Sequence, residues 1–346
     1  MNRPYTAILI VPTGVGAAIG GYAGDAIPVA RTLAQVCDRL ITHPNVLNGA
    51  SLYWNIPNAF YVEGYGLDKF AAGDWGLRPV RNNKVGLLLD QGIEPDLLLR
   101  HLQAADAARA TLGLTITDYV ITDAPLNVEL RTSASGASWG TIGNPDSLLR
   151  GAEKLMQKTG AEAIAVVARF PDDMDEDAVQ NYLQGKGVDI IAGAEAVISH
   201  LLVRHLQIPC AHSPALASAP PYPNLSPRSA AEELGYTFLP SVLVGLSRAP
   251  QFIVEKQLFT SCHDDIWADH IDAAIVPANA CGSSALLSLS QSRCQIITVR
   301  NNQTQIQVPA QPLGIKSIQV NSYLEAIGVL VALKAGINPH ALVNGQ

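Results

Sequence analysis

Short apolar segments alternate with helix-forming segments along the whole chain, and this alternation constrains the fold more than any other feature. Apolar runs bounded by turn-forming residues predict strands at 7–11, 84–90, 118–125, 162–168, 188–191, 208–210, 242–246, 272–277, 295–299, 305–308 and 318–320, and a short strand that begins at 40. Apolar residues at helical spacing predict helices between them, for example at 26–36 and 94–112. Strands joined by helices pair in parallel, because each helix returns the chain to the same end of the sheet. The sequence therefore predicts an α/β protein with a mainly parallel sheet and helices on both faces.

The chain is long enough for one large domain or for two α/β lobes. Residues 213–228 hold five prolines, which indicates either a junction between lobes at 1–212 and 229–346 or a rigid surface loop. Residues 51–83 are rich in aromatic side chains and show little periodicity, so we expect either a cover over a functional site or an oligomer contact.

The composition excludes several classes of function. The net charge is −7, and the 23 Lys and Arg residues are scattered, which argues against nucleic acid and against anionic membranes as partners. We expect no signal peptide and no membrane span, and five cysteines without a Cys-x-x-Cys pair indicate a reducing compartment, so the predicted location is cytoplasmic. Charged residues make up only 15% of the chain, against about 25% in a typical soluble protein, so we expect a homo-oligomer that covers part of its surface.

A glycine-rich loop joins the strand at 7–11 to the helix at 26–36, and Asp25 stands at the expected N-cap of that helix. Such a loop presents free backbone N–H groups to an anion. The spacing fits neither the dinucleotide fingerprint nor the Walker loop, since position 19 is Ile and no Gly-Lys-Ser or Gly-Lys-Thr follows. A phosphate or carboxylate cradle is expected from Thr13, Gly14, Gly16, Gly20 and Gly21. The alternative is a tight turn whose glycines allow close packing.

Two cysteines that follow strands are candidates for chemistry. Cys281 precedes a predicted helix, whose dipole would lower the pKa of the thiol and make it reactive. Cys210 also follows a strand, and the two thiols together would suit a two-base racemase or isomerase. Both cysteines would equally fit the role of small buried residues. Asp25 and His43 are the candidates for proton transfer or substrate orientation.

Further ligand-binding residues are expected in three loops that follow strands. They are Asn45 in the segment 43–45, Ser133 and Ser135 in the segment 132–138 of a loop predicted at 132–145, and Gly282, Ser283 and Ser284 in the segment 279–284 at a helix start. These three segments are the other expected walls of the anion site. The segment 262–270 contains several His, Cys and Asp residues, but its spacing matches no zinc pattern, and we predict no metal site. No cofactor follows from the sequence.

Several motifs together resemble one protein family. They are 11–16 (VPTGVG), 20–25 (GGYAGD), 41–45 (ITHPN), 61–64 (YVEG), 208–212 (IPCAH) and 321–328 (NSYLEAIG). The family that these motifs resemble occurs in cyanobacteria and plants, and its members are described as a conserved domain of unknown function. The similarity covers essentially the whole chain and implies a cyanobacterial or plastid setting. It carries no catalytic residues over.

Taken together, the residues predict a protein that binds and transforms a small anionic metabolite, a carboxylate or a phosphate, at the glycine-rich loop and neighbouring loops. Two alternatives stay open. One is a non-catalytic metabolite-sensing or scaffold protein, and the other is a cysteine-dependent racemase, isomerase or hydrolase.

Overall fold

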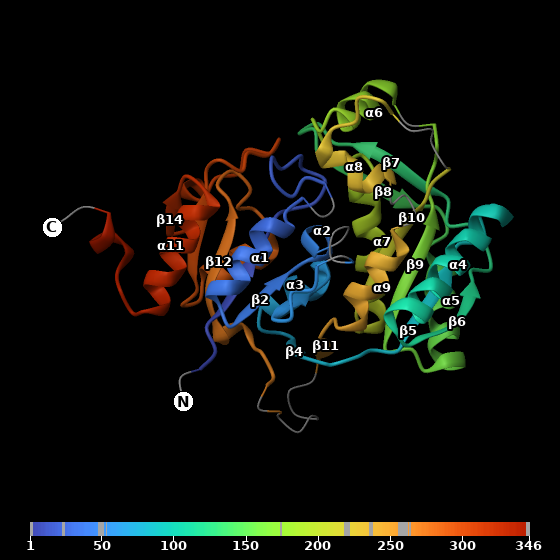
Figure 1. The fold of residues 1–346 in the computed structure, drawn as a ribbon, viewed down its shortest axis with the longest axis horizontal. Coiled ribbons are helices and arrows are strands. Elements are labelled where there is room, and N and C mark those ends of the chain that lie inside the picture. Colours follow the sequence, from blue (N-terminus) through green and yellow to red (C-terminus); the bar gives the residue numbers. More distant parts are fainter. Residues whose placement is uncertain are drawn as a thin grey trace.

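Two parallel sheets stand side by side, each with helices on both faces (Figure 1). The computed structural model describes residues 3–22, 25–47, 52, 54–173, 175–217, 222–234, 238–254, 262 and 264–343. The first sheet has six strands and the second has four. The predicted α/β class with a mainly parallel sheet is confirmed.

The first sheet takes strands from both ends of the chain. Its strand order is β14-β13-β12-β1-β2-β3, and all five pairings are parallel. The strands are β1 (Thr6–Leu9), β2 (Arg39–Thr42), β3 (Ala59–Tyr61), β12 (Ile271–Pro277), β13 (Gln295–Val299) and β14 (Ser317–Val320). The chain runs outward from β1 to β3, and later from β12 to β14 in the opposite direction. The two directions diverge between β1 and β12, where doubly wound sheets bind ligands beyond the carboxyl ends of the strands.

Residues of β1 alternate between two cores. Ala7 and Leu9 pack with α1 (Ile27–Val36) and α11 (Tyr323–Lys334). Ile8 and Ile10 pack on the other face with α3 (Gly64–Ala71) and α10 (Ser284–Ser290). A strand that is buried on both faces must be apolar at every position, which explains the continuous apolar run at its start. The short helix α2 (Pro44–Leu47) follows β2.

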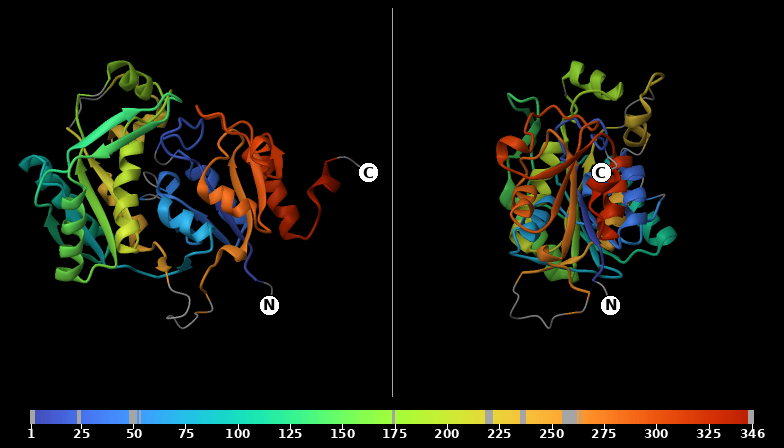
Figure 2. Two further views of the ribbon diagram at one scale, coloured as in Figure 1. Left: turned by 180° about the vertical axis from the view of Figure 1, so that it is seen from behind. Right: turned by 90° about the vertical axis from the view of Figure 1, so that its left-hand side faces the viewer.

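The second sheet has the order β10-β9-β5-β6, with strands β5 (Val85–Leu89), β6 (Ile116–Ile121), β9 (Ala163–Arg169) and β10 (Cys210–Ala215). One face is covered by α4 (Pro95–Leu112) and α9 (Leu239–Ser247), and the other by α5 (Pro145–Thr159) and α7 (Ala192–Leu206) (Figure 2). At one end of this lobe lie the hairpin of β7 (Val128–Thr132) and β8 (Ser138–Ile142), and the helices α6 (Glu176–Leu183) and α8 (Pro227–Leu234).

The second lobe is an insertion into the first. The chain enters it after β4 (Gly76–Arg78) and leaves it after β11 (Gln251–Ile253), and these two strands pair with each other in antiparallel fashion. The strands of the two sheets separate along the chain at β4 and β11. The junction predicted at 213–228, of which residues 218–221 lie outside the described residues, stays a prediction. The sequence does not reveal this division, because the pairing of β1 with β12 joins segments that are far apart along the chain.

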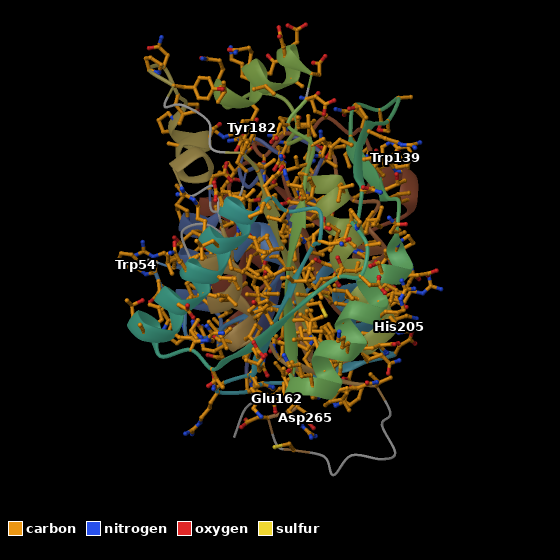
Figure 3. All side chains as sticks on the ribbon, turned by 90° about the vertical axis from the view of Figure 1, so that its right-hand side faces the viewer. Trp54, Trp139, Glu162, Tyr182, His205 and Asp265 are labelled. Atoms are coloured by element: carbon orange, nitrogen blue, oxygen red, sulfur yellow. The ribbon has the colours of Figure 1, made fainter. Side chains whose placement is uncertain are left out.

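Tyr182 and Asp265 lie at opposite ends of the molecule (Figure 3). The contact of Tyr182 joins the two lobes, and the contact of Asp265 lies where the chain passes from the first lobe into the second. At one end, the ring of Tyr182 on α6 meets the ring of Tyr22 edge-on at 5.0 Å. At the other end, Asp265 forms an ion pair of 2.8 Å with Arg78 at the end of β4.

Most predicted elements are confirmed, and three predictions at 188–191, 242–246 and 305–308 are wrong. The strand predicted at 242–246 is part of α9, which is buried between the second sheet and the first lobe. Because the run 242–246 is apolar at every position, it lacks the alternation of apolar and polar residues that marks a helix in a sequence. Residues 188–191 form no strand, and 305–308 contribute a single bridge at Val308. The loop predicted at 132–145 contains β8. The 3-10 helices η2 (Ala268–His270), η3 (Gln311–Leu313) and η4 (Pro339–Leu342) complete the fold.

Candidate functional site

A cavity of about 100 Å³ lies between the two lobes. It is wide enough for a small metabolite, since a single buried water needs only about 10–15 Å³ of such space. The first lobe lines it with residues that follow β1, β2 and β3, and the second lobe with the first turns of α7 and with β10. Its polar lining consists of Thr13, His43, Asn45, Glu63, Asp189, Glu195, Ser199, His200 and His212.

His43 follows β2 and presents a neutral imidazole to the cavity. Its Nε2 accepts the backbone N–H of Val11 at 3.2 Å, so the ring hydrogen is on Nδ1. Burial lowers the pKa of His43 to about 4, and the ring is therefore uncharged at neutral pH. A neutral histidine held in this way offers one fixed N–H donor to a ligand.

Glu63 and His200 connect the two lobes across the cavity. Glu63 is the N-cap of α3, where its Oε2 accepts the N–H of Tyr65 at 2.8 Å. Its Oε1 lies 2.8 Å from Nδ1 of His200 on α7. Burial lowers the pKa of His200, but the hydrogen bond and charge of Glu63 outweigh it, and the pKa is raised overall. This pair thus fixes α3 against α7.

A chain of polar contacts runs along the second-lobe wall. Asp189 accepts the N–H of Ile191 at 3.1 Å, just before α7 begins. Burial, and then the negative charge of Glu195, raises the pKa of Asp189 to about 7. Glu195 lies 3.5 Å from Nε2 of His212, whose Nδ1 is 2.6 Å from the hydroxyl of Ser199. The wall therefore holds an acid that changes its charge near neutral pH, next to a carboxylate and a histidine.

The charged groups of the lining are carboxyl groups and imidazoles. Three carboxyl groups and three imidazoles line the cavity, and no Lys or Arg is among the lining residues. In the part of the chain that the structure describes, no group of three or more His, Cys, Asp or Glu side chains has a geometry that could hold a metal ion. Glu63 pairs with His200 and Glu195 lies beside His212, so Asp189 is the lining carboxyl group that has no basic side chain beside it among the described residues.

Of the predicted site residues, Thr13, His43 and Asn45 reach the cavity. The amide Nδ2 of Asn45 also donates to the carbonyl of Gly20 at 2.7 Å, which ties the glycine-rich loop to α2. A Cβ on Gly21 would lie 2.2 Å from a carbonyl within the same loop, so this glycine serves the tight turn.

The glycine-rich loop packs against the second lobe. The carbonyl of Gly14 accepts the N–H of Ser138 on β8, and a Cβ on Gly14 would lie 2.6 Å from Oγ of Ser138. A Cβ on Gly16 would lie 2.6 Å from the carbonyl oxygen of Gly187. Close packing, the alternative reading of these glycines, accounts for both of them.

Asp25 anchors the same loop. Its carboxylate lies 3.2 Å from Nε of Arg228 on α8. Arg228 also donates to the carbonyls of Ala17 and Gly185 and lies over the ring of Tyr22 at 4.7 Å. Burial raises the pKa of Asp25 even though Arg228 opposes that shift. The structure places Asp25 in an ion pair between the lobes and outside the lining of the cavity.

The two candidate cysteines are buried and do not line the cavity. The thiol of Cys281 points to the carbonyl of Pro277, and burial raises its pKa to about 11. Burial also raises the pKa of Cys210 well above its usual value. The expected lowering of the Cys281 pKa is wrong, because the thiol is packed in the apolar core three residues before α10 begins.

This burial predicts a simple labelling pattern. Cys262 is the exposed member of the five cysteines, and the other four are buried. Brief treatment of the folded protein with iodoacetamide at pH 7.5 is expected to modify Cys262 before any other cysteine, as peptide mass spectrometry would show. Faster modification of Cys281 than of Cys262 would contradict the structure and would support the reactive Cys281 thiol that the sequence predicts.

The remaining predicted residues also lie outside the lining. Ser283 is the N-cap of α10 and accepts a backbone N–H of its first turn, and Ser284 begins that helix. Gly282 faces Val308, where a Cβ would approach to 3.0 Å. Ser133 and Ser135 lie in the turn of the β7–β8 hairpin with their hydroxyls 2.8 Å apart.

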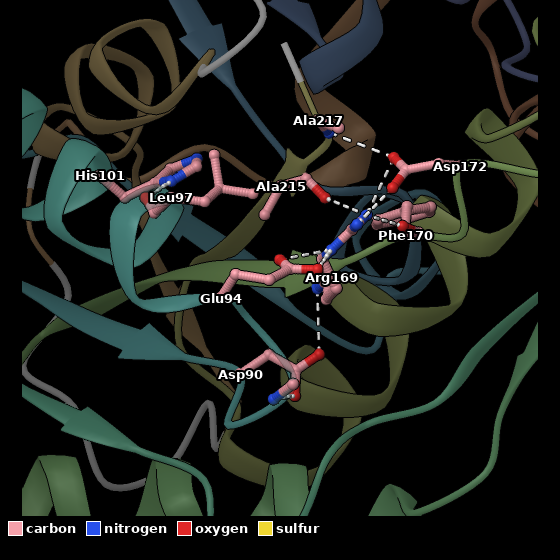
Figure 4. Close-up of polar contacts among 10 residues, drawn as sticks. Asp90, Glu94, Leu97, His101, Arg169, Phe170, Asp172, Ala215 and Ala217 are labelled. Atoms are coloured by element: carbon pink, nitrogen blue, oxygen red, sulfur yellow. Dashed lines mark hydrogen bonds and ion pairs between the residues drawn. The ribbon is translucent and has the colours of Figure 1, made fainter.

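The carboxyl edge of the second sheet is closed by its own polar groups (Figure 4). Asp90, after β5, accepts the N–H groups of Leu126 at 2.9 Å and of Arg169 at 3.0 Å. The guanidinium of Arg169 pairs with Glu94 at 2.8 Å and with Asp172. These residues bind one another, and the cavity forms instead where the first sheet meets α7.

The chain matches, over residues 6–343, a family model described as a protein of unknown function, DUF3326. The chain belongs to the DUF3326 family. An uncharacterised lipoprotein of Synechococcus sp. is 56% identical over 346 residues, a match that spans 100% of this chain and 95% of the relative. No solved structure matches this DUF3326 protein. The resemblance to a family of unknown function with cyanobacterial members is confirmed.

Within the described ranges of this DUF3326 protein, no helix has both the length and the apolar character that a membrane crossing requires. Its cytoplasmic location stays a prediction.

Proposed function

We propose that the cavity binds a small metabolite that carries a protonated amine, and that Asp189 exchanges a proton with it. The observation that carries this proposal is the buried carboxyl group of Asp189, which has no basic side chain beside it among the described residues. Its neighbour Glu195 has His212 at 3.5 Å, and no Lys or Arg is among the lining residues. An ammonium group would supply the missing positive charge and would favour the ionised form of Asp189.

The position of the cavity supports a functional role. It lies between two lobes and beyond the carboxyl ends of parallel strands, where ligand sites gather in α/β proteins. A general acid or base works best when its pKa is near the working pH, and the pKa of Asp189 is about 7. In this proposal Asp189 gives or takes the proton, Glu195 and His212 hold the charge beside it, and His43 orients an acceptor atom of the ligand.

The anionic metabolite expected from the glycine-rich loop stays a prediction. Two of its expected walls, 132–138 and 279–284, contribute no lining residue, whereas 43–45 does. A free phosphate in this cavity would face three carboxyl groups, and their repulsion disfavours it.

A thermal-shift screen at pH 7.5 tests the binding step. Primary amines, and matched carboxylates and phosphates without an amine, are compared on the wild-type protein and on Asp189→Asn. We expect amines to stabilise the wild type, since a ligand at 100 times its Kd adds about 2.7 kcal/mol, and we expect Asp189→Asn to lose most of that shift. Asp123→Asn, a substitution of an exposed carboxylate outside the lining, should keep it. Shifts by phosphates or carboxylates alone would contradict the amine proposal.

Incubation of each hit with the protein in D2O tests the proton-transfer step. We expect the protein to replace a carbon-bound hydrogen of the ligand with deuterium, seen as loss of its proton NMR signal, and Asp189→Asn to abolish this exchange. Binding without exchange, in either protein, would leave the non-catalytic sensor as the better account.

A further inference from the structure

A serine, a histidine and a glutamate follow one another along the second-lobe wall of the cavity, and all three line it. The hydroxyl oxygen of Ser199 is 2.6 Å from Nδ1 of His212, and Nε2 of His212 is 3.5 Å from a carboxylate oxygen of Glu195. Ser199 and Glu195 stand on one face of α7, and His212 stands on β10, which packs against α7. Hydroxyl, imidazole and carboxylate in this order form the arrangement that activates serine nucleophiles.

The surroundings of His212 favour one position for its ring hydrogen. An ionised carboxylate accepts hydrogen bonds and has none to donate, so Glu195 favours the form of the ring with the hydrogen on Nε2. Nδ1 then keeps its lone pair, and the hydroxyl of Ser199 donates to it. A serine held in this way passes its proton to the ring when its oxygen attacks a substrate.

Other hydroxyl groups inside helices of this chain are bonded differently. Thr32, Thr111 and Thr159 each donate to the carbonyl four residues earlier in the same helix. That bond is the ordinary local partner of a hydroxyl within a helix. The hydroxyl of Ser199 instead meets a histidine of another element, inside the cavity.

We propose that Ser199 is a nucleophile for acyl transfer, that His212 is its general base, and that Glu195 positions His212. The substrate is a small carboxylic ester or amide, because the cavity has a volume of about 100 Å³. This activity goes beyond the proposed amine site, although it shares the cavity. It requires neither an amine nor the proton of Asp189, so either proposal can fail without the other.

The reaction has two steps. In the first, Oγ of Ser199 forms a bond to the carbonyl carbon of the substrate, its proton passes to Nδ1 of His212, and an electron pair of the carbonyl moves to oxygen. That pair returns as the bond to the leaving alcohol or amine breaks, and the leaving group takes the proton from His212. In the second step water attacks the acyl group in the same way, which releases the carboxylic acid and restores Ser199.

The first lobe lines the same cavity with hydrogen-bond donors. Thr13, His43 and Asn45 carry a hydroxyl, an imidazole and an amide group. The imidazole of His43 has its hydrogen on Nδ1, because its Nε2 accepts the N–H of Val11. Acyl transfer places a negative charge on the carbonyl oxygen, and donors of this kind stabilise such a charge.

Reaction with p-nitrophenyl acetate, a small ester, tests the nucleophile. We expect an acetyl group on Ser199, identified by peptide mass spectrometry after an acid quench. Its formation should be about 100-fold slower or more in His212→Gln, since general base catalysis contributes about 10²–10⁴-fold. Ser147 is a matched control, because it is as buried as Ser199 but contacts the carboxylate of Asp123 and should stay unmodified. Asp123→Asn should leave the acetylation of Ser199 unchanged.

Nitrogen-15 NMR of the histidine rings tests the activation without any ester. Long-range correlations to the ring hydrogens show which nitrogen of a neutral imidazole is protonated, and His212→Gln identifies the signals of His212. We expect the hydrogen on Nε2 in the wild type at pH 8 and a larger share on Nδ1 in Glu195→Gln. A wild type with the hydrogen on Nδ1 would overturn the proposal, because Ser199 would then accept the hydrogen bond. Ester treatment that acetylates other residues and leaves Ser199 unmodified would overturn it as well.

Discussion

Asp189→Asn is expected to make the protein more stable above pH 7 than the wild type, although it removes the group that we propose to be functional. Burial and the nearby charge of Glu195 raise the pKa of Asp189 to about 7, so ionising it in the folded protein costs free energy. Asn is uncharged at every pH, and its side-chain oxygen can still accept the N–H of Ile191. The gain at pH 8 is up to about 4 kcal/mol, which is a shift of about three pH units at 1.36 kcal/mol each.

The gain has a defined pH window. In the unfolded chain Asp189 titrates near its ordinary pKa of about 3.9, whereas in the folded chain it keeps its proton up to about pH 7. The folded state therefore binds more protons between pH 4 and pH 7, and the wild type loses stability relative to Asp189→Asn as the pH rises through that range. Above pH 7 the difference is constant.

Denaturant unfolding of both proteins at several pH values between 4 and 8 measures this difference, and the other titrating groups cancel in the comparison. Asp123→Asn is a suitable control, because hydrogen bonds from Arg150 and Ser147 lower the pKa of Asp123 to about 2, and its loss should bring no gain above pH 7. Parallel stability curves for the wild type and Asp189→Asn would show that Asp189 ionises normally and would remove the physical basis of the proposed site.

The second large effect is expected at the glycine-rich loop. Gly14 has a φ of +68°, and a Cβ there would lie 2.6 Å from Oγ of Ser138. Gly14→Ala therefore combines a strained backbone, at about 1–2 kcal/mol, with a steric conflict between the lobes. Gly136 has a similar φ of +84° but no atom within 4 Å of a Cβ, so Gly136→Ala brings the backbone strain alone.

We expect Gly14→Ala to lower the free energy of unfolding by about 3–4 kcal/mol and Gly136→Ala by about 1–2 kcal/mol. Urea denaturation followed by circular dichroism measures both values. Equal losses of unfolding free energy in the two variants would mean that Gly14 is needed only for its backbone conformation and not for the contact with Ser138. A small loss in both variants would favour the anion cradle that the sequence predicts for this loop.

The strands and helices could be predicted from the sequence where the chain carries local signals. A continuous apolar run ended by Pro12 marks β1, and helical spacing with Pro95 in the first turn marks α4. The helix α9 gave no such signal, because it is largely buried and its run 242–246 is apolar at every position. The insertion of the second lobe depends on strand pairing across the chain, which no local pattern encodes.

The candidate site was only partly predictable for a related reason. His43 and Asn45 directly follow a recognisable strand, and they do line the cavity. The residues of α7 do not follow a strand, yet Glu195 and Ser199 recur at a spacing of four residues, which places them on one face of that helix. That spacing was the signal by which the sequence could have indicated the second-lobe side of the cavity. The contact of Glu63 with His200 joins two lobes and could only come from the structure.

The carboxyl carbon of Asp189 offers the most direct test of the central claim, that a buried acid pair in the cavity changes its charge near neutral pH. Its carbon-13 chemical shift can be followed against pH in protein labelled at aspartate, with Asp189→Asn identifying the signal. We predict a midpoint near pH 7 in the wild type, a lower midpoint in Glu195→Gln, and a lower midpoint when an amine that binds is added. A midpoint near pH 4 in the wild type, unchanged by Glu195→Gln, would contradict the account.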